Sequence, residues 1–409
     1  MSLDLSQTVL QVQAAAQRLK SSASAQAQRL ALALSTYERC SQPASATFDH
    51  LKAKIALSQG KVTFLVAGVA APPDAIGADA APTDYIALAT DGSHIDVDRH
   101  SPAQVYLINI SKVALRYGAS PEATLSSSPT LYAAPEDMVL KDPASAYEIP
   151  VEGPLVGVRR TVSELAALLD LAEQAPNGVP LLALVDGSLI LWTLAGQGYP
   201  EFVRDTFLVD GFLKLLDKAL ELHKKKGLLL ASYISHPRST DVVNALRMDS
   251  ELCPYEVADC DKHCGKLAWG QRPCDKIAGV MDRDVFARTL SVEERSTPFL
   301  SLSSIVQKYY GVHQVYFFYV NIGGEIARIE IPAWLAQDSE APNLLQALLL
   351  DQTRRGLGYP VALAEAHEQA VVTTGDRERF WEMVANAMES QGLAPAVSAK
   401  SRSKELPWV

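Results

Sequence analysis

Residues 85–93 have the sequence YIALATDGS, an apolar run typical of a buried β-strand that leads directly into Asp91, a glycine and a serine. Residues 181–188, LLALVDGS, repeat this pattern and present Asp186 in the same way. A carboxylate at such a place lies at the edge of a hydrophobic core, where the glycine lets another group approach the backbone. The two stretches therefore predict two metal-binding aspartates, with an ordinary Asp-Gly hairpin turn as the alternative at each.

A helix is predicted between these two strands. It begins at Thr161, carries Glu164 at capping-box spacing and leads into the second strand. An aspartate on the first strand, a glutamate on a helix and an aspartate on the next strand is the order in which ribonuclease H-like nucleases gather three carboxylates. Such hard oxygen ligands suit Mg²⁺ or Mn²⁺ better than Zn²⁺ or copper. The simpler interpretation of Glu164 is a first-turn glutamate stabilised by the helix dipole, and Glu173 on the same helix is a competing candidate.

Helices and strands alternate along the remaining chain, which predicts a mixed α/β fold. We expect further strands at 105–110 (antiparallel to the first strand), 228–234, 315–321 and 325–331, and helices at 202–226, 241–248, 282–290, 300–310, 343–355, 361–371 and 376–390. Residues 118–155, which are rich in Ser, Pro and Ala, are expected to form a long surface excursion.

The composition is that of a folded protein with a sizeable core, because 48% of the 409 residues are hydrophobic and 21% are charged. The formal net charge of −10 speaks against a histone-like protein that coats polyanions by bulk charge, although a local groove could still hold DNA. No stretch reaches the ~18 uninterrupted apolar residues of a membrane span, and the first residues lack the pattern of a signal peptide. We therefore expect a cytoplasmic protein without a membrane segment.

Six segments, in the same order along almost the whole chain, resemble the NurA family of DNA-end-processing nucleases. The segments are 89–95 (ATDGSHI), 184–190 (LVDGSLI), 294–296 (ERS), 317–319 (FFY), 328–332 (RIEIP) and 358–360 (GYP) together with Ala366-His367. The resemblance implies a ribonuclease H-like core, an α/β fold with a mixed sheet flanked by helices. By matching motif, it places the family's catalytic positions at Asp91, Glu164, Asp186, Tyr359 and His367, and it implies Mn²⁺ or Mg²⁺ held by Asp91, Glu164, Asp186 and His367.

The resemblance also implies a function and partners. It implies a metal-dependent deoxyribonuclease that hydrolyses phosphodiester bonds at DNA ends in double-strand break repair. The implied activity is that of an exonuclease, and single-strand endonuclease activity is a further possibility. It further implies a homodimer that works with a hexameric HerA-type ATPase. We predict three parts of the chain: an N-terminal helical arm at 1–58, a nuclease domain at 59–391 with a Cys-rich insertion at 251–276, and a mobile tail at 392–409.

Tyr359 and His367 are eight residues apart, with Pro360 between them. The tyrosine therefore precedes a helix whose third turn carries the histidine, and both side chains could face one cleft. An imidazole can ligate a metal or donate a proton to a leaving oxygen, and a phenol can orient phosphate or water. The alternatives are an aromatic core residue and a surface histidine.

Four of the five cysteines lie within 22 residues, at Cys253, Cys260, Cys264 and Cys274, with His263 as a further candidate ligand. A structural Zn²⁺ or an iron–sulfur cluster is one interpretation of this segment. Reduced or partly disulfide-bonded thiols in a loop are the other.

Basic residues near two helix ends are candidates for contacts with DNA phosphates: Lys214, Lys218, Lys224, Lys225, Lys226, Arg354 and Arg355. For the lysine run, a solvated helix end is the alternative. Two other functions stay open from the residues alone. One is a non-catalytic DNA-end or ATPase-binding dimer that retains the nuclease fold, and the other is a ribonuclease with the same core.

Overall fold

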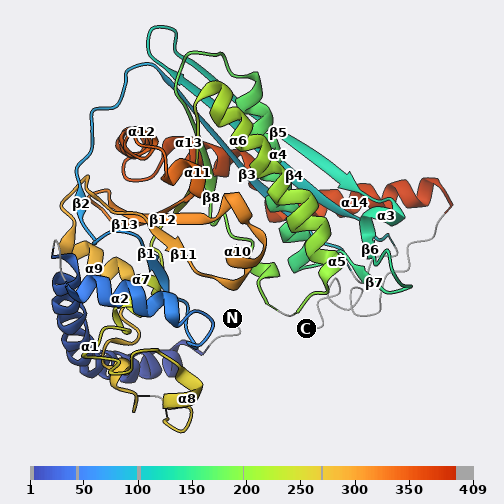
Figure 1. Cartoon of the computed structure of the whole chain (residues 1–409). Coiled ribbons are helices and arrows are strands. Elements are labelled where there is room, and N and C mark those ends of the chain that lie inside the picture. Colours follow the sequence, from blue (N-terminus) through green and yellow to red (C-terminus); the bar gives the residue numbers. More distant parts are fainter. Residues whose placement is uncertain (1–3, 43–45, 99–102, 197, 269, 393–409) are drawn as a thin grey trace. The chain divides into compact units, whose positions relative to one another are not determined.

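The computed structural model describes residues 4–42, 46–98, 103–196, 198–268 and 270–392 (Figure 1). The chain divides into two compact units. Unit 1 contains the described residues up to 78 together with 234–308 and 314–330, and unit 2 contains 79–233, 309–313 and those from 331 onwards. The predicted C-terminal tail lies outside the described residues apart from Gly392, and the predicted domain limits stay a prediction. None of the described helices is both long enough and apolar enough to cross a membrane.

Five strands of unit 2 form a mixed sheet in the order β5-β4-β3-β8-β9. Their bounds are β3 Tyr85–Ile95, β4 Tyr106–Tyr117, β5 Glu122–Tyr132, β8 Leu181–Asp186 and β9 Leu228–Ile234. Strand β4 is antiparallel to β3 and β5, whereas β3, β8 and β9 are parallel to one another. This is the strand order of the ribonuclease H-like fold, so the predicted fold class is confirmed.

The other elements of unit 2 are helical segments and one small two-stranded sheet. They are α3 Pro135–Met138, β6 Val139–Lys141, β7 Glu148–Pro150, α4 Pro154–Gln174, η1 Trp192–Leu194, α5 Glu201–Arg204, η2 Asp205–Leu213, α6 Lys214–Lys226, η4 Gly311–His313, α11 Ala333–Ala336, α12 Ala341–Arg355, α13 Val361–Ala370 and α14 Thr374–Ser390. The predicted helix at 202–226 is present as one run of α5, η2 and α6, with a π-helical turn pattern over η2.

Helices α4 and α13 cover opposite faces of strand β3. The Thr90 hydroxyl donates to the Glu164 carbonyl of α4 at 2.9 Å, whereas the hydroxyl of Ser93 donates to the Ala370 carbonyl at the end of α13. Successive side chains of a strand point to opposite faces, so residues 90 and 92 face α4 and residues 91 and 93 face α13. The sheet is therefore covered by a helix on each side at the point where Asp91 lies.

Unit 1 combines long N-terminal helices with short antiparallel strands in the order β1-β11-β12-β13, while β10 pairs with β12 and β2. The bounds are α1 Leu5–Ser41, α2 Ala46–Leu57, β1 Ala67–Val69, β2 Ala75–Ile76, α7 Asp241–Leu246, α8 Cys260–Cys264, η3 Pro273–Ile277, α9 Asp282–Thr289, β10 Arg295–Ser296, β11 Phe299–Ser301, α10 Ser304–Tyr309, β12 Val315–Asn321 and β13 Ile326–Pro332.

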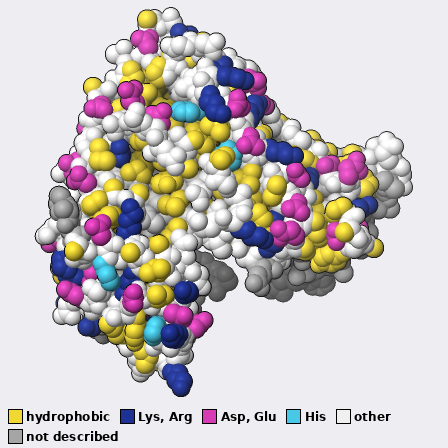
Figure 2. Space-filling view, in the orientation of Figure 1, with side chains coloured by type: hydrophobic (Ala, Val, Ile, Leu, Met, Phe, Trp, Pro, Cys, Tyr) yellow, Lys and Arg dark blue, Asp and Glu magenta, His cyan; other side chains and the backbone are white. Residues whose placement is uncertain are grey.

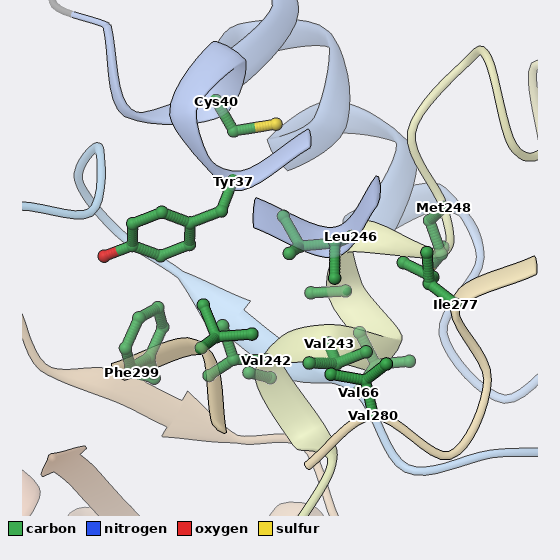
Figure 3. Packing of buried hydrophobic residues seen from close by; sticks show 14 of the residues in the cluster. Tyr37, Cys40, Val66, Val242, Val243, Leu246, Met248, Ile277, Val280 and Phe299 are labelled. Carbon is green, nitrogen blue, oxygen red and sulfur yellow. The ribbon is translucent and has the colours of Figure 1, made fainter. Parts of the chain in front are cut away.

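The core of unit 1 joins the second half of α1 to α7 and to the strands. Tyr37 and Cys40 of α1, Val242 and Leu246 of α7 and Phe299 of β11 belong to one cluster of buried residues (Figure 3). All five side chains are at least 95% buried. This half of α1 is therefore part of the folded core of its unit.

Four sequence predictions differ from the structure. The helix predicted at 300–310 begins only at Ser304, because residues 299–301 pair with β12 as strand β11. The segment 118–155 contains the eleven-residue strand β5, whose side chains are almost all exposed and which is held by backbone pairing with β4. Helix α4 begins at Pro154, seven residues before Thr161, because a proline at its first position follows Gly153, which has a positive φ of 54°. Asp91 lies inside β3, because the pairing with β4 continues to Ile95. A hairpin turn at Asp91 is thereby excluded.

Candidate active site

The two predicted aspartates lie side by side on neighbouring parallel strands. The register pairs Thr90 of β3 with Val185 of β8, so Asp91 and Asp186 occupy the next position on each strand. Asp186 is the last residue of β8 and is exposed, whereas the side chain of Asp91 is 19% exposed. Gly187, with φ 98°, turns the chain away directly after Asp186.

Glu164 reaches the same place from α4, where it is 94% buried. Gly92 makes this approach possible, because a β-carbon at position 92 would lie only 2.6 Å from Glu164 Oε1 and 2.9 Å from Arg160 Cγ. The expectation that the glycine admits another group is therefore confirmed at Gly92. Glu173, the competing candidate, instead forms an ion pair with Lys218 at 2.9 Å and is not brought to this site.

The three carboxylates perturb one another electrostatically. Burial raises the pKa of Glu164 to about 8, and the negative charges of Asp91 and Asp186 add to this shift, while Arg160 opposes it. Desolvation and the charge of Asp91 also raise the pKa of Asp186. Without a cation, the site therefore favours keeping a proton on Glu164.

Tyr359 and His367 contact the two aspartates. His367 Nδ1 lies 2.9 Å from Asp91 Oδ2, and the hydrogen bond from Tyr359 to Asp186 offsets part of the rise in the pKa of that aspartate. The Tyr359 ring also packs edge-on against Tyr233 of β9, with ring centroids 5.2 Å apart. His367 is the seventh residue of α13, at the end of the second turn and not in the third turn as predicted, and its side chain is 65% exposed. The structure thus brings all five predicted residues together.

An open cleft of about 520 Å³ lies over the carboxylates. Helix α4 forms one wall, and the segment that follows β8 forms the other. The lining residues are Asp91, Pro154, Gly157, Val158, Arg160, Thr161, Glu164, Asp186, Gly187, Ser188, Ile190, Leu191, Trp192 and Thr193. A cleft of this size is large enough for a nucleotide-sized ligand.

The donor set fits a hard divalent cation. Three carboxylates converge, and the buried oxygen Glu164 Oε1 accepts no hydrogen bond from the described residues, although Arg160 Nε lies 3.0 Å away. Arg160 forms an ion pair with this oxygen, but one positive charge does not balance three carboxylates, and a divalent cation would supply the remainder. Within the described part of the chain, no group of three or more His, Cys, Asp or Glu side chains is placed so that it could hold a metal ion as it stands. The residues therefore offer the ligand chemistry without a rigid preformed cage.

The cysteine segment consists of free thiols in unit 1: Cys253, Cys260, Cys264 and Cys274. Burial raises the pKa of Cys264 and of Cys274, and neighbouring cysteines add to both shifts, so these thiols stay protonated. The ring of His263, the further candidate ligand, stacks on Tyr255 with centroids 3.9 Å apart. A structural metal at this segment stays a prediction.

Most of the predicted DNA-contacting cations are paired with acidic side chains of their own unit. Lys214 pairs with Asp210, Lys218 with Asp170 and Glu173, Lys224 with Glu221, and Arg355 with Asp351. The Lys226 ammonium donates to carbonyls at the end of α4, including that of Ala175 at 2.6 Å, and so caps this helix. Their contacts with DNA stay a prediction, as do those of Lys225 and Arg354.

Two of the motif segments, and residues 328–330 of a third, belong to unit 1 and have a structural role there. The Arg328 guanidinium is buried, lies 3.6 Å from the centroid of the Phe317 ring and pairs with Glu330 at 3.0 Å and with Asp241. Tyr319 donates to Asp282, which also accepts from two backbone N–H groups of α7. Arg295 is buried with its guanidinium over the Phe318 ring.

Sequence reasoning missed two residues that line the cleft, Arg160 and Trp192. Arg160 precedes Glu164 by one helical turn, but the predicted helix began after it. A tryptophan six residues after a strand-end aspartate was the available signal for the second.

The NurA domain family model matches residues 86–372, and this match covers more than half of the chain and all five site residues. The chain therefore belongs to the NurA domain family, which is a family of nucleases. A comparison with curated proteins finds no match. Among solved structures, LC9-RNase H1, described as a type 1 RNase H with the type 2 active-site motif, is 9% identical with a TM-score of 0.20. That alignment covers 52% of this chain and 89% of the other.

Proposed function

We propose that this protein is a metal-dependent deoxyribonuclease that hydrolyses phosphodiester bonds at DNA ends. The observation that carries the proposal is the meeting of Asp91, Glu164 and Asp186 in one open cleft, where His367 and Tyr359 contact the two aspartates. Carboxylates that repel one another without a cation are costly to maintain, so their assembly is accounted for by a catalytic metal site. A non-catalytic protein with this fold has no need of them.

Asp91, Glu164 and Asp186 would hold Mn²⁺ or Mg²⁺, with His367 as a further candidate ligand. When bound, such a cation polarises the phosphate, favours a hydroxide nucleophile and stabilises the departing 3′ oxygen. Cation binding at the three carboxylates requires loss of the proton that the buried Glu164 favours.

His367 and Tyr359 supply positioning and proton transfer. Asp91 holds His367 through Nδ1, which leaves Nε2 as the ring nitrogen that can face a substrate. In the imidazolium form, Nε2–H can donate its proton to the leaving oxygen. Tyr359 donates to Asp186 and thereby fixes the orientation of that carboxylate.

The surface charge bears on how DNA reaches the site. Figure 2 shows Lys and Arg side chains interspersed with Asp and Glu on the face in view, and the whole chain carries a net charge of −10. We propose that DNA is retained by the metal site and by a partner, a hexameric HerA-type ATPase that feeds DNA ends to a homodimer during double-strand break repair. Such an ATPase should raise the rate of DNA degradation by the full-length protein.

Comparison of nucleic acid substrates tests the proposed activity. The full-length protein is incubated with labelled linear double-stranded DNA, single-stranded DNA, closed circular DNA and RNA, each with Mn²⁺, Mg²⁺ or EDTA. We expect metal-dependent degradation of linear and single-stranded DNA, with closed circular double-stranded DNA resistant.

Three outcomes would contradict the proposal. Degradation of RNA alone would make the protein a ribonuclease. Equal cleavage of closed circular and linear duplexes would remove the role of DNA ends. Binding of DNA ends without hydrolysis under any metal condition would favour the non-catalytic alternative.

A further inference from the structure

The active-site cleft changes in chemical character along its length. Its acidic part contains the three carboxylates, and its apolar part contains Pro154 and Val158 from α4 and Ile190, Leu191 and Trp192 from the segment after β8. On the helix, Pro154, Val158, Thr161 and Glu164 lie at spacings of three and four residues, so they follow one face from apolar to acidic. A ligand that matches both parts has a phosphate and an apolar group.

Trp192 is the exposed aromatic of this cleft. It is 44% exposed, although Ile190 and Leu191 directly before it are 98% and 95% buried. The indole Nε1 donates to Ser188 Oγ at 3.1 Å, and the same oxygen accepts from the Ile190 backbone N–H at 3.0 Å. The only polar atom of the indole is thus satisfied within the protein. The ring is held in place from one edge, and the exposed part of Trp192, 44% of the residue, offers an apolar aromatic contact.

We propose that Trp192 is the stacking platform for a nucleobase of the DNA strand whose phosphate lies at the carboxylates. This proposal rests on the proposed nuclease function and adds a specificity-determining residue to it. A base is planar and apolar on its faces, and its own backbone phosphate is the group that the acidic part of the cleft would take through a bound cation. A nucleotide therefore matches the gradient of the cleft.

Stacking on Trp192 also selects the form of the substrate. Inside a duplex both faces of a base are covered by its neighbours, so a base that packs against the ring is either unpaired or the last base of a strand. Every base has a π-face, so the contact adds affinity with little sequence preference. The geometry thus assigns the preference for a strand end or an unpaired base to the cleft itself.

Binding measured without hydrolysis tests this assignment. The full-length Asp91→Asn protein, assayed in Mn²⁺, serves as the background, and Trp192→Ala or Trp192→Phe is added to it. The control adds Tyr147→Ala instead, because Tyr147 is an aromatic residue that is 56% exposed and does not line the cleft. Fluorescence anisotropy reports affinity for short labelled single strands, each with one abasic nucleotide at a different position. Trp192→Leu, which keeps an apolar side chain without an aromatic face, replaces Trp192→Ala if the latter fails to fold.

We expect Trp192→Ala to weaken binding about 5- to 150-fold, the range for loss of one base–aromatic stack, and Trp192→Phe and Tyr147→Ala to stay within a few-fold. One abasic position should weaken binding by a similar factor with Trp192 present and should add little in Trp192→Ala, because both changes remove the same contact. Equal affinities of the Ala and control variants, or an abasic effect that is independent of residue 192, would overturn the proposal.

Hydrolysis by the unmutated protein, assayed in parallel, separates this inference from the proposed function. If the unmutated protein hydrolyses DNA while Trp192→Ala binds normally, the stacking platform is wrong and the nuclease stands. If base-dependent binding at Trp192 is found but no hydrolysis occurs with either metal, the platform stands and the nuclease proposal is wrong.

Discussion

At the scale of single residues, Glu164 is the group whose protonation should respond most to burial and to the neighbouring carboxylates. It is 94% buried beside two other carboxylates, and its pKa is raised to about 8, chiefly by burial. The first effect of a bound cation is therefore to compete with this proton, and metal affinity should rise with pH until Glu164 is ionised.

The same shift predicts the pH dependence of stability in the metal-free protein. Between the ordinary glutamate pKa of 4.5 and about 8, folded Glu164 holds a proton that the unfolded chain has released. Stability should therefore fall as pH rises through this window, by at most about 1.4 kcal/mol for each pH unit. We expect Glu164→Gln to lose this dependence, as judged by urea unfolding midpoints in EDTA from pH 5 to pH 8.

Glu173→Gln is the matched control, because Glu173 lies on the same helix but is 62% exposed and paired with Lys218. It should keep the pH dependence of the unmutated protein. The same slope in the unmutated protein and in Glu164→Gln would show that Glu164 does not titrate in this range.

At the scale of elements, the site depends on how closely α4 approaches β3. Gly92 is the residue that permits this approach, because any β-carbon there would meet Glu164, Arg160 and Ile110 at 2.6–2.9 Å. Gly92 does not have a positive φ, so its role is steric, whereas Gly187 at the end of β8 has φ 98°.

We predict that Gly92→Ala displaces Glu164 and slows DNA hydrolysis about 100-fold or more, the cost of misplacing a catalytic group by ~1 Å. Overpacking at this point should also lower the free energy of unfolding by about 1–3 kcal/mol. Hydrolysis rates and urea unfolding measure the two effects. Gly375→Ala in α14 is the control, since its β-carbon would have no neighbour closer than 3.9 Å. Unchanged hydrolysis by Gly92→Ala would contradict the assigned position of Glu164.

Elements with a buried apolar pattern could be predicted from the sequence, and elements held by backbone pairing alone could not. The runs before Asp91 and Asp186 indicated strands because their side chains are buried on both faces of the sheet. Strand β5 gave no such signal, since its Ser- and Thr-rich side chains are almost all exposed. The start of α4 was missed because a Pro-Leu-Val-Gly sequence resembles a loop. Arg160 was lost from the site with that missed turn.

Contacts between residues that are distant in the sequence could not be predicted from the residue types and their spacing. The pairing of Asp91 with His367 joins residues 276 positions apart, and only the resemblance to the family suggested it. The buried ion pair of Arg328 and Asp241 in unit 1 was not predicted, because arginine and aspartate are residue types that usually lie on the surface.

At the scale of the whole molecule, the proposed homodimer has a candidate surface in the first turns of α1. Four apolar side chains there are more than half exposed: Leu5, Val9, Leu10 and Val12. Leu5, Val9 and Val12 follow one face of the helix, and an apolar stripe of this kind is buried by a second copy in many helical dimers.

We predict a particle of twice 44.2 kDa by light scattering at micromolar concentration, and we expect Val9→Asp to shift it toward the monomer mass because a charge would enter the apolar stripe. Gln11→Asp, an equal charge change at an exposed position two residues away, should leave the dimer intact. A mass near 44.2 kDa for the unmutated protein would remove the shared-dimer arrangement while leaving the chemistry of each site in place.

The most direct test of the central claim is the rate at which Asp186→Asn hydrolyses labelled linear DNA at saturating Mn²⁺. The substitution removes a metal-binding charge and keeps the side-chain size, so we predict loss of activity to the background level with an unchanged fold. Asp170→Asn, on the surface of α4 and paired with Lys218, should retain full activity. Full activity of Asp186→Asn under the same conditions would contradict the assignment of the three carboxylates as the hydrolytic centre.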